Sequence, residues 1–157
     1  MAIALADLLD PKHVRLNLRS RAIATAIREL VVLLVTNEQV ADGQTFANQV
    51  IEREQTNPSE VEEGVVFPHV RTELVEKIVL AIGRSRTGVR FGTAGIRANL
   101  IFVIGVPQRL VSDYLVCVGA LARVARQAAV RADLMRAETP EQFIEILSAA
   151  AAPDGAR

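Results

Sequence analysis

The segment that most constrains the fold is residues 98–106, ANLIFVIGV, because it is apolar on both of its alternating faces. Successive side chains of a β-strand point to opposite sides of the sheet, so this strand has to be covered on both sides. Residues 77–83, KIVLAIG, resemble it, and the SRTG sequence at 85–88 predicts a turn that pairs the two strands antiparallel. The sequence therefore predicts a single α/β domain in which helices flank both sides of a central β-sheet.

The helices that would cover this sheet are marked by residues that can cap a helix N-terminus. Three such residues precede apolar stripes: Ser20, Asp42 and Thr139. Ser112 is expected to start a further, long helix. Pro140 and Gln142 follow Thr139 at the spacing of a capping box. The helix after Asp42 is expected to end near residues 53–54. The helix after Ser112 is expected to face the core with these residues: Leu115, Val118, Leu121, Ala122 and Ala125.

Near the N-terminus, residues 14–18 alternate apolar and polar side chains, as in a half-buried strand. At the other end, residues 151–157 are expected to fray. The folded domain is therefore expected to span residues 1–150.

Charge and hydropathy exclude several classes of protein. The 18 basic and 18 acidic residues of the 157-residue chain give a net charge of zero, which argues against nucleic-acid binding. The longest apolar run, residues 30–35, is far shorter than the roughly 18 residues that cross a bilayer, so a membrane-embedded protein is not expected. The N-terminus lacks the pattern of a secretory signal, and we expect a cytoplasmic location.

The cysteine content gives no support for a metal or a disulfide. The single cysteine, Cys117, has no intramolecular partner and is expected to be a small core residue. No Cys/His spacing typical of metal sites occurs, so neither a metal nor a cofactor is expected.

One of the two histidines directly follows a proline, in the stretch GVVFPHV. Residues 65–67 are typical of a buried strand, and Pro68 cannot donate a hydrogen bond to a neighbouring strand, so the strand is expected to end there. His69 would then lie where the backbone leaves the sheet and turns, which is a common place for reactive side chains. From this stretch alone, His69 is either such a reactive residue or an ordinary polar loop residue. The other histidine, His13, is expected to be structural or incidental.

The segment from Arg53 to His69 resembles a known family. It is similar to the enzyme IIA domain of the fructose/mannitol and nitrogen-related branch of the phosphoenolpyruvate-dependent sugar phosphotransferase system. That family carries an Arg-Glu pair at a helix end, a loop S-T-G-I-G-x-G, and an apolar strand that ends in Pro-His. Without a gap, Arg53 and Glu54 match the pair, Ser59 matches the loop threonine, and Pro68-His69 match the dipeptide. LIFVIGVP, LARVARQ and the closing TPEQFIEIL extend the resemblance over nearly the whole chain.

The resemblance implies a mixed sheet and a phosphocarrier. His69 would accept a phosphoryl group from an HPr-like donor and pass it to an enzyme IIB partner, or use it as a regulatory signal. Arg53 and the loop around Ser59 would supply the donors and positive charge that a phosphohistidine needs. No cofactor is implied. The chain is also expected to be able to self-associate, although no sequence feature fixes an interface.

The chain departs from the family pattern in two places. Glu60 and Glu62 replace two loop glycines and Glu63 follows, which adds negative charge and removes backbone freedom beside the phosphate. Tyr114 stands where the family has a second histidine; it would either donate to a phosphate or pack as an aromatic. Two functions therefore stay open: a working phosphotransferase with a phosphohistidine intermediate, or a regulatory binding module on the same fold that controls a transporter or kinase without phosphoryl transfer.

Overall fold

The computed structural model describes residues 5–92 and 95–151. Its α-helices are α1 (Ile23–Thr36), α2 (Gly43–Thr56), α3 (Val111–Ala125), α4 (Ala128–Arg136) and α5 (Pro140–Ala150). Its strands are β1 (Val14–Arg15), β2 (Val65–Val66), β3 (His69–Arg71), β4 (Val79–Phe91) and β5 (Ile96–Val106). Short 3-10 helices lie at Leu5–Leu8, Pro11–His13 and Gln108–Leu110. The expected frayed end, from residue 152 on, lies outside the described residues.

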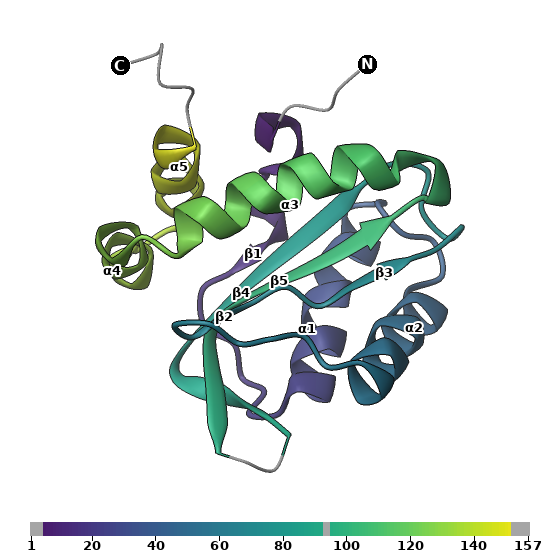
Figure 1. Cartoon of the computed structure of the whole chain (residues 1–157), viewed down its shortest axis with the longest axis horizontal. Helices are drawn as coiled ribbons and strands as arrows, with labels where there is room; N and C mark the ends of the chain where they lie inside the picture. Colours follow the sequence, from purple (N-terminus) through teal and green to yellow (C-terminus); the bar gives the residue numbers. More distant parts are fainter. Residues whose placement is uncertain (1–4, 93–94, 152–157) are drawn as a thin grey trace.

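Strand β5 is the centre of the sheet. It pairs antiparallel with β4 and parallel with both β2 and β3, while β4 pairs parallel with β1. The sheet is therefore mixed, as the resemblance implied. Its two faces are covered by different helices: α1 and α2 pack on one side, and α3, α4 and α5 on the other (Figure 1). The prediction that residues 98–106 form a strand buried on both faces is confirmed, because Phe102 and Val103 lie in different clusters of the core and both are fully buried.

The turn predicted at SRTG is wrong. Strand β4 continues through these residues with a register shift between Arg84 and Val89, and the hairpin bends farther on, between Phe91 and Ile96. The polar residues of this part of β4 stay in the strand because their polar groups form hydrogen bonds elsewhere in the fold. Arg84 is buried, and its guanidinium donates to the carbonyls of Leu16, Leu134, Met135 and Ala137.

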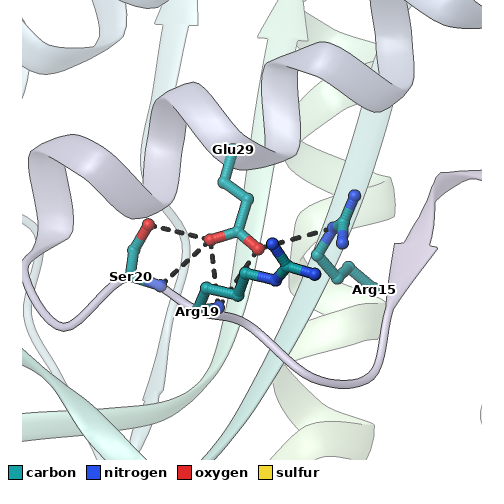
Figure 2. A network of polar contacts seen from close by, with 4 residues as sticks. All are labelled: Arg15, Arg19, Ser20 and Glu29. Atoms are coloured by element: carbon teal, nitrogen blue, oxygen red, sulfur yellow. Dashed lines mark hydrogen bonds and ion pairs between the residues drawn. The ribbon is translucent and has the colours of Figure 1, made fainter.

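The prediction that Ser20 caps the first helix is also wrong. The N-cap of α1 is Ala22, and no side chain caps it. The Ser20 hydroxyl instead donates to Glu29 on α1 at 2.8 Å, and the backbone N–H groups of Arg19 and Ser20 donate to the same carboxylate (Figure 2). Glu29 thus fixes the segment that enters α1 and takes the hydroxyl away from the cap position. The strand expected at residues 14–18 is shorter in the structure and covers Val14–Arg15.

Two of the other capping predictions are confirmed. Asp42 accepts from the N–H of Thr45, and Thr139 accepts from the N–H of Gln142, each at 3.1 Å. The third helix begins at Val111, one residue before the expected Ser112, and it has no side-chain cap.

Within α3 the expected orientation needs a correction. Leu115 is 63% exposed, whereas Tyr114 and Cys117 are buried. The core-facing stripe therefore passes through Tyr114, Cys117 and Leu121, and Cys117 is the core residue that the sequence predicted. Among the described residues, no helix is long and apolar enough to cross a membrane.

Candidate functional site

His69 is the first residue of β3, where it pairs with Ile104 of β5. The expectation that the chain leaves the sheet after Pro68 is wrong. Pro68 separates two short strands that both pair with β5, and its carbonyl accepts from the N–H of Ile104 at 2.9 Å. A proline is tolerated here because the interruption needs no N–H donor. His69 is therefore half-buried on a strand that pairs only with β5, which holds its backbone more firmly than a turn would.

The contacts of the imidazole assign its tautomer. Its Nδ1 lies 2.9 Å from the carbonyl oxygen of Phe67, and its Nε2 lies 3.2 Å from Nη2 of Arg53. A carbonyl can only accept, so Nδ1 carries the proton and Nε2 keeps a lone pair that accepts from the guanidinium. A neutral imidazole with one nitrogen oriented and the other available is the form that a histidine nucleophile needs.

Arg53 reaches the histidine from the last turn of α2. Its Nη1 donates to the carbonyl of Asn57, the C-cap residue of the helix, at 3.0 Å. The helix itself is fixed by Phe46 and Val50, which are fully buried under the sheet. The guanidinium is therefore held at the imidazole by the helix end from which it extends. The predicted pair of Arg53 and His69, sixteen residues apart, is brought together.

Glu54 holds the loop that follows α2. It is 6% exposed and accepts from both the N–H and the hydroxyl of Ser59, the former at 3.0 Å. The Ser59 hydroxyl therefore donates to Glu54, although the residue lines the same pocket as His69. Sequence reasoning noted Glu54 only as part of the Arg-Glu pair and missed this role.

The acidic part of the loop forms a tight turn. The backbone groups of Glu62 and Val65 bond to each other in both directions, at 3.0 and 2.9 Å, and the two residues between them have positive φ: 53° for Glu63 and 79° for Gly64. The carboxylates face different arginines. Glu62 accepts from Arg126 at 3.1 Å, and Glu63 lies 3.7 Å from Arg131. Glu60 is exposed at the rim of the pocket.

Tyr114 lies against the imidazole from the first turn of α3. The two ring centroids are 5.4 Å apart, and the tyrosine is only 9% exposed. Burial raises the pKa of the Tyr114 phenol, which Arg53 and Arg71 partly offset. The phenol is thus neutral at physiological pH and keeps its O–H as a donor. Tyr114 thus packs as an aromatic beside the histidine, and donation from its O–H to a phosphate stays a prediction.

These side chains line one small pocket of about 220 Å³. It contains the predicted residues His69, Arg53, Ser59 and Tyr114, together with Glu60, Glu62 and Arg126. A larger and more apolar cavity of about 780 Å³ lies across the loop and shares Ser59 and Glu60, but His69 does not line it. The smaller pocket has the size and the two arginines that suit an anion such as a phosphoryl group. Among the described residues, no group of three or more His, Cys, Asp or Glu side chains is arranged to hold a metal.

Comparison with known proteins places this chain in a family. The model of the family "Phosphoenolpyruvate-dependent sugar phosphotransferase system, EIIA 2" matches residues 7–150. The PTS system fructose-specific EIIA component of Haloferax volcanii is 32% identical over 124 residues, which cover 78% of this chain and 80% of that protein. The PTS system fructose-specific EIIABC component of Bacillus subtilis is 27% identical over 90% of this chain, which spans only 22% of that longer protein.

Solved structures agree on the fold. The nitrogen regulatory protein IIA-Ntr from Neisseria meningitidis is 25% identical and superposes with a TM-score of 0.82 over 91% of this chain and 98% of that one. The enzyme IIAMTL of Escherichia coli, solved in complex with phosphorylated IIBMTL, is 20% identical with a TM-score of 0.75 over 90% and 97% of the two chains. The chain therefore belongs to the EIIA 2 family of the phosphoenolpyruvate-dependent sugar phosphotransferase system, the family that its sequence resembles.

Proposed function

We propose that His69 is the phosphoryl acceptor, that Nε2 is the attacking atom, and that an HPr-like protein is the donor. The observation that carries the proposal is the pair of contacts on the imidazole, Nδ1 to the carbonyl of Phe67 and Nε2 to Arg53. The first contact fixes the ring and its tautomer. The second places a permanent positive charge where the phosphoryl oxygens arrive.

The transfer step balances without a cofactor. The Nε2 lone pair attacks phosphorus, the bond between phosphorus and the donor nitrogen breaks, and its electron pair returns to the donor imidazole. Nothing is oxidised or reduced. Nδ1 keeps its proton on the carbonyl of Phe67, while Arg53 moves its N–H groups from Nε2 to the phosphoryl oxygens. Passing the group on is the same step in reverse, with another nucleophile as acceptor.

The acceptor of the phosphoryl group is proposed to be an enzyme IIB. The Escherichia coli neighbour was solved in complex with phosphorylated IIBMTL. The Bacillus subtilis relative is named an EIIABC component, a name that joins A, B and C. Leu115 and Val116, 63% and 67% exposed, lie on the helix that carries Tyr114 and offer apolar surface for a protein partner. The proposal also places the protein in the cytoplasm. Self-association remains a prediction without an assigned surface.

A regulatory module without phosphoryl transfer is the second candidate. Glu60 and Glu62 favour it, because both line the pocket and oppose a negatively charged phosphoryl group. The name of the Neisseria meningitidis neighbour, a nitrogen regulatory protein, agrees with a role of this kind. In this candidate the surface around His69 would bind a transporter or kinase directly.

Phosphorylation by the natural relay separates the two candidates. Incubated with phosphoenolpyruvate, enzyme I and HPr from its own organism, the protein should acquire an acid-labile phosphate, and H69A should abolish labelling while His13 remains in place. R53A should slow transfer by about a hundredfold, because it removes electrostatic stabilisation but keeps the nucleophile.

If labelling of the natural protein is weak, a variant of Glu60 and Glu62 distinguishes the phosphocarrier from the regulatory module. A variant with E60G and E62G should be labelled faster than the natural protein. Brisk labelling of that variant without labelling of the natural protein would favour the regulatory module. Absence of labelling in both proteins would contradict the phosphocarrier proposal for His69.

A further inference from the structure

We infer that Arg126 is a second phosphate-binding residue of the His69 pocket and that Glu62 occupies it as an internal counter-ion until a phosphoryl group arrives. This inference rests on the proposed function of His69 and adds to it a residue and an exchange of partners. Arg126 lies at the C-cap of α3, far from Arg53 and His69 in the sequence, yet it lines the same pocket.

The position of Glu62 is set by its backbone. The reciprocal hydrogen bonds with Val65 and the two residues with positive φ between them form the tight turn described above. The turn directs the Glu62 side chain to the pocket, where it meets Arg126 at 3.1 Å. A carboxylate held against an arginine in the pocket that His69 lines occupies a place that an incoming anion could take.

The pair is weak enough to exchange. The side chains of Arg126 and Glu62 are 48% and 45% exposed, and an ion pair between exposed side chains contributes little to stability. A phosphoryl group brings close to two negative charges and three acceptor oxygens, so it competes well for the guanidinium. Arg53 supplies one positive charge and already shares its N–H groups with Asn57 and His69. A dianion in this pocket is matched better by two arginines than by one.

The exchange would also change the surface that a partner protein meets at Glu62. When Arg126 turns to the phosphoryl group, the Glu62 carboxylate loses its partner at the rim of the pocket. The phosphorylated and unphosphorylated forms therefore differ at the surface by more than the phosphate itself. A partner that carries a basic side chain opposite Glu62 would favour the phosphorylated form.

The neighbouring glutamate provides a matched control. Glu63 comes from the same turn as Glu62, but it faces Arg131 of α4 at 3.7 Å, and both line a separate cavity that His69 does not line. E63Q therefore removes the same charge from the same turn as E62Q and should leave anion binding at His69 unchanged. Arg131 itself is not a control, because its Nη1 donates to the backbone carbonyl of Arg126.

Binding of inorganic phosphate, followed by the NMR shifts of the His69 imidazole, tests the inference without any carrier protein. We expect E62Q to bind phosphate about twofold to fivefold more tightly than the natural protein, because phosphate no longer has to displace Glu62 from its exposed ion pair with Arg126. R126A should bind about fivefold to tenfold more weakly, because a charge-assisted hydrogen bond is lost from a partly solvated site. E63Q should bind as the natural protein does.

The double variant E62Q/R126A tests the exchange itself. Because Glu62 acts through Arg126, the gain from E62Q should vanish in the R126A background. An equal gain in both backgrounds would mean that Glu62 only repels the anion, and would overturn the inference. It would also be overturned if R126A bound phosphate as tightly as the natural protein, or if E62Q bound phosphate no more tightly than E63Q.

Failure of the inference is distinguishable from failure of the proposed function. If HPr labels His69 while R126A binds phosphate as tightly as the natural protein, the proposed function holds and the inference is lost. If no carrier labels the protein or its E60G/E62G variant but phosphate binding follows the expected order, the anion site holds and the phosphocarrier proposal is lost.

Discussion

The loop beside His69 depends on Glu54, and its removal should be costly. Glu54 is buried near the C-terminal end of α2, where the helix dipole disfavours a negative charge, and two donors from Ser59 compensate. A hydrogen bond to a charged group contributes about 1.5–3 kcal/mol. Because the loop is partly exposed, we take the lower value for each bond, so E54A should lower the free energy of unfolding by about 3 kcal/mol.

Conservative variants refine this prediction. E54Q should cost only about 1 kcal/mol, since the amide oxygen still accepts from the Ser59 N–H and the amide N–H can donate to the hydroxyl. S59A removes the hydroxyl alone and should cost about 1.5 kcal/mol.

Urea unfolding of the single and double variants is the assay. The double-mutant cycle of E54A and S59A should give a coupling energy of about 1.5 kcal/mol, because both changes remove the same hydroxyl bond. In thermal unfolding, E54A should lower Tm by about 6–12 °C, from about 2–4 °C per kcal/mol in a domain of this size. A cost of E54A below about 1 kcal/mol, or a coupling near zero, would refute this account of the loop.

Three further changes test other parts of the structure. His13 is buried with its Nε2 unpartnered among the described residues, and this burial lowers its pKa below the ordinary value of 6.5. The protein should therefore lose stability as the pH falls through about 6.5. In H13Q the midpoint of urea unfolding should change less between about pH 7.5 and 5.5 than it does in the natural protein. G64A should cost about 2 kcal/mol, since φ is 79° and an added Cβ would lie 2.8 Å from Oδ1 of Asn99, and equal stability in urea would contradict it. R84L should cost about 4 kcal/mol or prevent folding, because it leaves several buried carbonyls without a donor; a variant as stable as the natural protein would show that the guanidinium is dispensable.

The part of the fold that followed from the sequence is the part fixed by local pattern. A strand that is apolar on both faces has few alternatives, and residues 98–106 lie where the pattern indicated. The caps at Asp42 and Thr139 also act within a few residues of themselves. Helix α4 was not predicted, because its alanine-rich sequence carries little periodicity.

The wrong predictions have a common cause in partners that are distant in sequence. Ser20 has the chemistry of a cap but is bonded to Glu29, and the polar SRTG sequence stays in a strand while Arg84, just before it, finds carbonyls of other elements. Leu115 was assigned to the core from spacing alone, one residue away from the stripe that is buried.

In the candidate site, too, contacts between residues distant in sequence could not be predicted from local pattern. His69 and Arg53 are sixteen residues apart, and no local rule predicts that Nε2 and Nη2 meet at 3.2 Å; the family resemblance supplied that pair. The arginine that pairs with Glu62 could not be found from sequence, because Arg126 is sixty-four residues away. Glu62 was expected from sequence to oppose a phosphate, whereas in the structure its carboxylate pairs with Arg126, which is the basis of the exchange proposed above.

The measurement that tests the central claim most directly identifies the phosphorylated atom. After phosphorylation by the phosphoenolpyruvate relay, long-range nitrogen-proton NMR of the imidazole distinguishes Nε2 from Nδ1. The account predicts phosphate on Nε2 of His69 with the proton kept on Nδ1, because the Phe67 carbonyl holds that proton. Phosphate on Nδ1, or on any residue other than His69, would contradict it.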